Sequence, residues 1–112
     1  MKLNYREENG VVVLQPEGKI MGGPDASLLH DKLYECIKAD KKKVVIDLAG
    51  VEWMNSTGLG ILIQGYTTLR NSDGKLKIAR VTEKIQSLLT ITKLVGVFDS
   101  YDSVEDAVRS FE

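Results

Sequence analysis

The run Val44-Val45-Ile46-Asp47-Leu48 is the segment that most narrows what this chain can fold into. It lies between two stretches with helical periodicity, one from about Pro24 to Ala39 and one from about Thr57 to Arg70. A short, almost continuous run of β-branched residues after a helix is typical of a central, fully buried strand. Because such strands alternate here with helices, the sequence predicts an α/β fold around a mostly parallel sheet.

The remaining segments extend this alternation in both directions. Asn9-Gly10 separates two β-like segments, 2–8 and 11–18, and predicts a hairpin because both turn residues tolerate a positive φ angle. Pro16 indicates that the second of these strands becomes an edge or bulges towards its end. Further strands are expected at 75–81 and 97–98, a third helix after the cap residue Thr82, and a last helix at the capping box Asp102-Ser103-Val104-Glu105. The prediction is one α/β domain, residues 1–112, with a mixed, mostly parallel sheet, an N-terminal hairpin strand and about four helices.

Each helical stretch carries an apolar stripe, which we expect to face the sheet. In the second helix Leu59, Leu62 and Tyr66 belong to this stripe. Ile61 falls outside it, and we therefore expect Ile61 to be partly exposed.

The composition disfavours several classes of protein. Fifteen basic and sixteen acidic side chains give a net charge of −1, which argues against nucleic acid or an anionic membrane as the main partner. One cysteine cannot form an internal disulfide, and one histidine leaves little for metal or acid–base chemistry. We therefore expect a protein that is not an enzyme and uses no metal or cofactor. No apolar run approaches the ~18 residues of a spanning helix, and we expect a cytoplasmic protein.

The segment 51–60 joins the end of the buried strand to the start of a helix, where ligands and partners of α/β sheets usually dock. Its three consecutive cap residues, Asn55-Ser56-Thr57, exceed what one helix requires. Gly58 and Gly60 each weaken the helix by roughly 1 kcal/mol relative to alanine. One explanation is structural: Ser56 caps the helix, Gly58 fits a tight turn and Gly60 packs against the sheet. The other is that a second molecule approaches the backbone closely.

Three further features have simple explanations. His30 and Cys36 are six positions apart on one predicted helix, ~240° around its axis, so they form no nucleophile–base pair. Lys41-Lys42-Lys43 is interpreted as a solvated entry to the next strand. We expect Trp53 to cover the loop from the core side, the alternative being an exposed anchor at an interface.

The loop and its surroundings resemble a known family. Asp47-Leu48-Ala49-Gly50-Val51, followed by Met54-Asn55-Ser56-Thr57-Gly58-Leu59-Gly60, is similar to the signature of STAS-domain proteins, and within them to bacterial anti-sigma factor antagonists. The resemblance covers nearly the whole chain. It includes Gly18-Lys19-Ile20, Leu88-Leu89-Thr90-Ile91-Thr92-Lys93-Leu94, Val97-Phe98 and Tyr101-Asp102-Ser103-Val104-Glu105-Asp106-Ala107.

The resemblance implies a function by partner switching. An antagonist of this family binds an anti-sigma factor that is also a serine protein kinase, and thereby frees the sigma factor. Phosphorylation of a loop serine, here Ser56, dissociates the complex, and a serine phosphatase restores the binding form. The implied partner-binding residues are Met21, Gly22, Gly23, Asn55, Ser56, Thr57, Gly58, Gly60 and Ile61.

Two departures from the family pattern keep alternatives open. Asn55 stands where the family usually has an aspartate, and Met21 stands where an acidic residue is frequent. The chain could therefore be a STAS adaptor that works without phosphorylation in a signalling or transport assembly. A third interpretation is a small-molecule enzyme with a deep polar pocket at Ser56.

Overall fold

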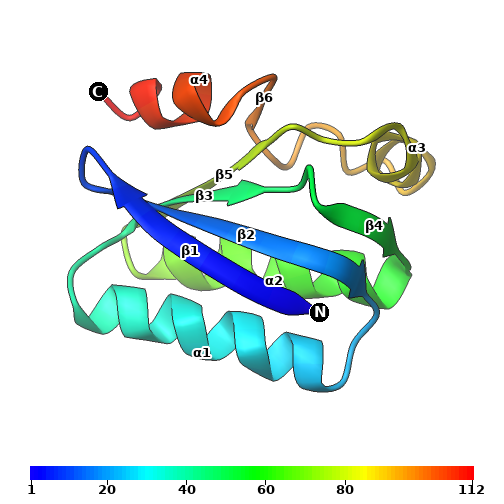
Figure 1. Cartoon of the computed structure of the whole chain (residues 1–112), viewed down its shortest axis with the longest axis horizontal. Coiled ribbons are helices and arrows are strands. Elements are labelled where there is room, and N and C mark those ends of the chain that lie inside the picture. Colours follow the sequence, from blue (N-terminus) through cyan, green and yellow to red (C-terminus); the bar gives the residue numbers. More distant parts are fainter.

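Six strands form one sheet, and four helices cover its two faces in the computed structural model, which describes residues 1–112 (Figure 1). The elements in chain order are β1 (Lys2–Glu8), β2 (Val11–Ile20), α1 (Pro24–Lys38), β3 (Lys43–Asp47), β4 (Val51–Met54), α2 (Ser56–Asn71), β5 (Lys75–Ala79), α3 (Glu83–Ile91), β6 (Ser100–Tyr101) and α4 (Val104–Arg109). Helices α1 and α2 lie on one side of the sheet and α4 lies on the other, while α3 lies at the end of the sheet near β4 (Figure 1).

The sheet has the order β1-β2-β3-β5-β6, with β4 attached to the far end of β2. β1 and β2 are antiparallel and are joined by the Asn9-Gly10 turn, whose residues both have positive φ. All other pairings are parallel. The predicted α/β class, the N-terminal hairpin and the four helices are therefore confirmed.

β2 changes its neighbour halfway along. Its first half pairs with β3 up to Leu14, whereas Gly18–Ile20 pairs with β4 after a register shift between Gly18 and Lys19. On this side of β2, Pro16 lies between the two pairings, so its missing N–H interrupts neither of them, while on the other side it lies opposite Leu3 of β1. The predicted irregularity near the end of this strand is thus confirmed.

Two strand predictions are wrong. The segment predicted to be a loop, 51–60, contains the strand β4, and the last strand is Ser100–Tyr101 instead of 97–98. Phe98 is buried because its ring packs edge to face against Tyr66, with 5.6 Å between the ring centroids, so its apolar character reflects side-chain packing in a turn.

The helix caps are close to those expected. Thr82 caps α3 by accepting a hydrogen bond from the amide of Ile85. In α4, however, the cap is Ser103, which accepts from the amide of Asp106 at 3.0 Å, one residue later than the predicted box. The neighbouring position holds a residue that can also cap, so sequence spacing did not separate the two.

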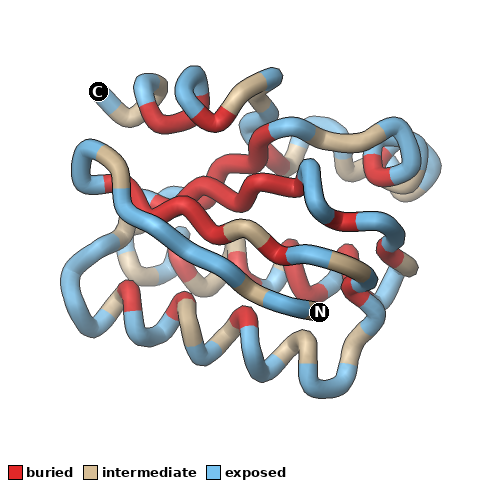
Figure 2. The backbone as a smooth tube through the Cα atoms, viewed as in Figure 1, coloured by how far each residue is buried: buried red, intermediate tan, exposed pale blue.

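The core has two parts, seen as the buried centre of the sheet and the inner sides of the helices (Figure 2). Twenty buried residues fill the space between the sheet, α1 and α2 and extend to α3, and seven others lie between the sheet and α4. α1 and α2 pack closely because Gly65 faces Leu33, and a Cβ there would lie 2.8 Å from the Leu33 side chain.

Candidate functional site

The candidate site lies where β2 and β4 end next to each other. Lys19 pairs with Trp53 and Ile20 with Met54 in parallel register. Two loop segments follow, 21–23 and 55–57, and the second of them includes the first two residues of α2; both therefore leave the same edge of the sheet (Figure 1). The fold thus brings together the two segments that sequence reasoning selected for partner binding.

The two loops are in direct contact through glycines. A Cβ on Gly22 would lie 2.9 Å from the Thr57 methyl carbon. A Cβ on Gly58 would lie 2.0 Å from the carbonyl oxygen of Ile20. The close approach that requires Gly58 is therefore made within the molecule, between the first turn of α2 and the end of β2.

The first of these loops is also held by Asp25. The amide of Met21 donates to Asp25 Oδ2 at 3.2 Å, and Oδ1 of the same carboxylate lies 3.2 Å from the terminal amine of Met1. Gly22 and Gly23 have φ angles of 116° and 61°, which glycine adopts without strain. Met21 itself remains exposed.

Asn55 and Ser56 have different roles at the start of α2. Asn55 is the cap, and its Oδ1 accepts from the amide of Gly58 at 2.7 Å. Ser56 is the first helical residue, is exposed, and its hydroxyl makes no hydrogen bond. The structural explanation in which Ser56 caps the helix is therefore wrong.

The start of α2 presents an environment that favours a negative charge. Amides in a first helical turn have no partner within the helix, and the helix dipole is positive at this end. The first turn of α2 contains no acidic residue. An anionic group on Ser56 would therefore meet favourable charges from its own domain.

Gly60 and Ile61 lie differently from what was expected. Gly60 is exposed, and a Cβ there would meet nothing within 4 Å, so Gly60 does not pack against the sheet. Ile61 is only 5% exposed and belongs to the core, so the predicted exposure is wrong. The physical reason is that β4 packs against this end of α2, so the helix buries a wider side than its apolar stripe predicts.

Trp53 lies at the edge of the candidate site, and its predicted position is wrong. Its side chain is 40% exposed instead of covering the loop from the core side. With Met21, which is 45% exposed, it lines a surface hollow flanked by two lysines. The hollow is lined by Lys19, Met21, Glu52, Trp53 and Lys84. The alternative prediction, an exposed tryptophan, had a signal in the sequence, because tryptophan is enriched at interfaces.

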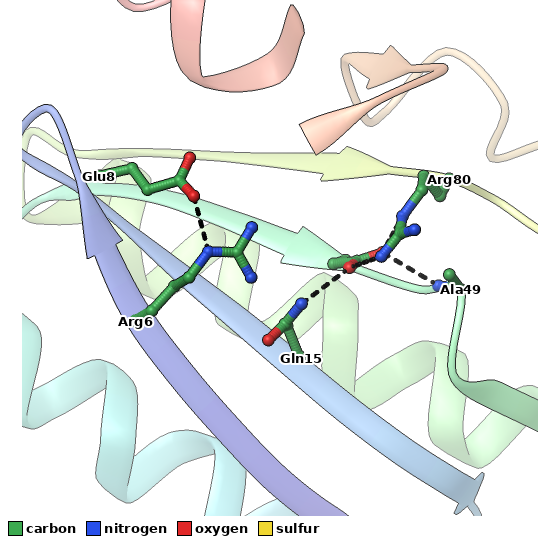
Figure 3. A network of polar contacts seen from close by, with 6 residues as sticks. Arg6, Glu8, Gln15, Ala49 and Arg80 are labelled. Atoms are coloured by element: carbon green, nitrogen blue, oxygen red, sulfur yellow. Dashed lines mark hydrogen bonds and ion pairs between the residues drawn. The ribbon is translucent and has the colours of Figure 1, made fainter. Parts of the chain in front are cut away.

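Asp47, at the end of β3, fixes the turn that leads into β4. Its carboxylate accepts from Gln15 Nε2 at 3.1 Å, from the Ala49 amide at 3.1 Å and from two nitrogens of Arg80 (Figure 3). Burial alone would raise the pKa of Asp47, but the hydrogen bonds from Arg80, Gln15 and Ala49 and the charge of Arg80 hold this pKa below its ordinary value. The ionised carboxylate is thus the form that this turn requires.

We expect Asp47 to make stability depend on pH. A folded-state pKa below the unfolded value stabilises the protein at neutral pH, and this contribution is lost as pH falls through the folded pKa, below about pH 4.

Asp47→Asn should lower the free energy of unfolding at pH 7 by about 2 kcal/mol, because the new amide NH2 group would face the donors of Gln15, Ala49 and Arg80. Urea unfolding from pH 7 to pH 3 measures this, and the difference from wild type should shrink in acid. Asp31→Asn, at an exposed carboxylate without an ion pair, should change stability little at any pH. A difference between Asp47→Asn and wild type that persists unchanged at pH 3 would contradict the expectation.

Ser56 lies on an open surface. None of the five main hollows of the molecule is lined by Ser56 or Asn55. No group of three histidine, cysteine or acidic residues is placed to hold a metal ion. None of the four helices combines the length and apolarity of a membrane-spanning segment. What the site offers chemically is a hydroxyl without a hydrogen bond at the start of a helix, at the same edge of the sheet as the exposed Met21 and Trp53 side chains.

Comparison with known proteins gives a consistent result. The family model for the STAS domain matches residues 2–107. The anti-sigma-B factor antagonist of Bacillus subtilis is 30% identical over 86 residues, which cover 75% of this chain and 76% of that protein.

Solved structures share the fold along almost the whole chain. The crystal structure of an anti-sigma factor antagonist from Mycobacterium paratuberculosis has a TM-score of 0.81 at 25% identity and covers 97% of this chain and 92% of that one. The Bacillus cell fate determinant SpoIIAA in its phosphorylated form has a TM-score of 0.76 at 13% identity, covering 99% of this chain and 100% of that one.

Proposed function

Because the chain belongs to the STAS domain family, we propose that it is an anti-sigma factor antagonist that acts in the cytoplasm. Its relatives with this name are regulatory binding proteins and not enzymes. In this proposal the chain binds an anti-sigma factor through the loops 21–23 and 55–57, and the sigma factor is released. The anti-sigma factor is also a serine kinase, which phosphorylates Ser56 and ends the complex, and a serine phosphatase reverses the modification.

The observation that carries the proposal is the position of Ser56. Its hydroxyl is exposed, makes no hydrogen bond and stands at the first position of α2. A phosphoryl group adds about −1.5 to −2 charges, which a helix start tolerates, so the domain should stay folded. A partner packed on this surface would instead have to accommodate both the bulk and a desolvated charge. Phosphorylation would therefore break the complex without unfolding the antagonist.

The proposed partner surface differs from the predicted one by two residues removed and one added. Gly58 and Ile61 are buried, and we leave them out of it. Trp53 is added, because it is exposed beside Met21. The surface then consists of Met21, Gly22, Gly23, Trp53, Asn55, Ser56, Thr57 and Gly60.

Phosphate transfer tests the role of Ser56. Incubation with the cognate anti-sigma kinase and ATP should add one phosphate to the wild-type protein, detected as a mass increase and located by peptide mass spectrometry. Ser56→Ala should accept none, whereas Thr57→Ala, at the next hydroxyl, should still accept it. We expect Asn55→Asp to keep the cap and to be phosphorylated faster, because it restores the acidic residue that the family usually has.

The alternative function, an adaptor that is not phosphorylated, predicts a different outcome. The neutral Asn55 is the observation that favours it. Tight binding of the anti-sigma factor without any transfer to Ser56, in wild type and in Asn55→Asp, would establish the adaptor and refute the switch.

Trp53→Ala is expected to weaken binding of the anti-sigma factor by about thirtyfold, because large aromatic side chains dominate the free energy of interfaces. Stability should change little, since Trp53 is 40% exposed and lies outside the core. The matched control is Tyr34→Ala, an exposed aromatic residue on α1, which should bind like wild type. Calorimetric titration measures both variants. Equal affinities for Trp53→Ala and wild type would remove Trp53 from the partner surface.

A further inference from the structure

A second surface hollow, lined mostly by polar residues, lies at the opposite edge of the sheet from Ser56, where the parallel strands begin. It is an open space of about 560 Å³, and its lining includes the two residues that follow α4. Its lining consists of Gly10, Asp40, Lys42, Lys43, Asp73, Lys75, Lys77, Ser110 and Phe111. Four lysines face two aspartates, which leaves a local surplus of two positive charges in a chain whose net charge is −1.

The lysines are placed together by the register of β3 and β5. Lys43 and Lys75 are direct partners in this parallel pair. Lys77 follows Lys75 by two positions and so points to the same face of the sheet. Like charges directly opposite each other destabilise a sheet, so this arrangement is costly for the isolated domain.

Only one of the four lysines is paired with a carboxylate. Lys42 lies 3.6 Å from Asp40, whereas Lys43, Lys75 and Lys77 form no ion pair. Asp40 is almost fully exposed and Asp73 is exposed, so both belong to the rim. The interior of the hollow therefore carries a larger positive charge than the surplus of two that all its lining residues give together.

Lys77 differs from a surface lysine because it is only 5% exposed. Its ammonium donates to Ser110 Oγ at 2.7 Å and to the Ser110 carbonyl at 3.4 Å, and it lies 4.3 Å from the centre of the Phe111 ring. These contacts orient the charge but do not neutralise it. A buried charge without a counter-charge is unfavourable, and an anion in the hollow would supply what the protein does not.

We propose that this hollow binds a small anion that carries two or more phosphate groups, held by Lys43, Lys75 and Lys77. Lysine binds phosphate as a flexible point charge with several donors, which suits an array of three ammonium groups in a polar hollow. A nucleic acid would need an extended basic track with several stacking aromatic residues, whereas the hollow is compact and its one aromatic residue, Phe111, packs against Lys77. The site is independent of Ser56 and of the anti-sigma factor, since it lies at the other edge of the sheet.

Calorimetric titration of the full chain with inorganic pyrophosphate at low ionic strength tests the proposal. Wild type should show saturable binding, and the double variant Lys43→Gln/Lys75→Gln should bind at least about tenfold more weakly. The control Lys19→Gln/Lys84→Gln has the same net charge as the hollow variant, but its substitutions lie at the edge of the sheet that holds Ser56. It should bind pyrophosphate like wild type. The hollow variant should unfold at the same or a higher temperature than wild type, because it removes like-charge repulsion.

Three outcomes would overturn the proposal. The first is the absence of saturable binding to wild type. The second is an equal loss in the two double variants, which would indicate attraction by net charge alone. The third is binding of poly-L-glutamate without pyrophosphate, which would assign the hollow to an acidic protein segment.

Discussion

Replacing Ser56 with aspartate is expected to weaken binding to the cognate anti-sigma factor by about a hundredfold or more, while the free energy of unfolding stays within about 0.5 kcal/mol of wild type. The two effects separate because they depend on different surroundings of the same side chain. Within the domain, residue 56 is exposed at a helix start that favours a negative charge. In a complex, the same carboxylate would be desolvated against the partner.

Two variants at the same position distinguish charge from size. Ser56→Asn has the shape of the aspartate without its charge, and we expect it to bind more tightly than Ser56→Asp. Ser56→Ala should bind constitutively, with no response to the kinase. Calorimetric titration gives the affinities and urea unfolding gives the stabilities. If Ser56→Asp binds as tightly as wild type, the proposed switch is wrong.

Gly58→Ala is expected to destabilise the domain by about 3 kcal/mol, the largest stability effect of a single methyl group in this chain. The added carbon would lie 2.0 Å from the carbonyl oxygen of Ile20 and 2.9 Å from the Met54 side chain. The first of these atoms is backbone at the end of β2, so relief requires the strand and α2 to separate. The surface formed by the two loops should be distorted at the same time.

Gly60→Ala is the matched control, two residues further along the same helix. A Cβ at Gly60 meets no atom within 4 Å, so the substitution should raise the free energy of unfolding by up to about 1 kcal/mol through helix propensity alone. Urea unfolding of both variants measures the contrast. Similar effects at Gly58 and Gly60 would refute the contact that we assign to Gly58.

The parts of the fold that the sequence predicted are those with strong local signals. The Asn9-Gly10 turn, the β-branched run at 44–48 and the periodic helices each need little more than their own residues to be recognised. β4 lacked such a signal, because it has four residues and buries only Val51 and Met54. Its identity depends on pairing with β2, a contact between segments about thirty positions apart.

The errors at the candidate site follow from that one missed strand. Ile61 is buried because β4 lies near the start of α2, and Trp53 is exposed because it precedes the buried Met54 on β4, so its side chain points to the opposite face. The positions of Asn55 and Ser56 were predictable as a pair, since both are cap residues, but which of them caps was settled by the hydrogen bond to Gly58. The spacing of cap residues and glycines in the sequence locates the loop around Ser56, whereas the hydrogen bonds and exposure within this loop depend on the neighbouring strands.

The exposure of Trp53 also provides an optical signal. The chain contains one tryptophan, so its ultraviolet emission on selective excitation comes from a single position, three residues before Ser56. At 40% exposure the indole ring is in contact with water, and a molecule that covers it would shift the emission to shorter wavelength. Occupancy of the loop edge can therefore be followed in real time without a label. The lysine hollow at the other edge lies outside the reach of this reporter, so the two surfaces can be titrated separately in one sample.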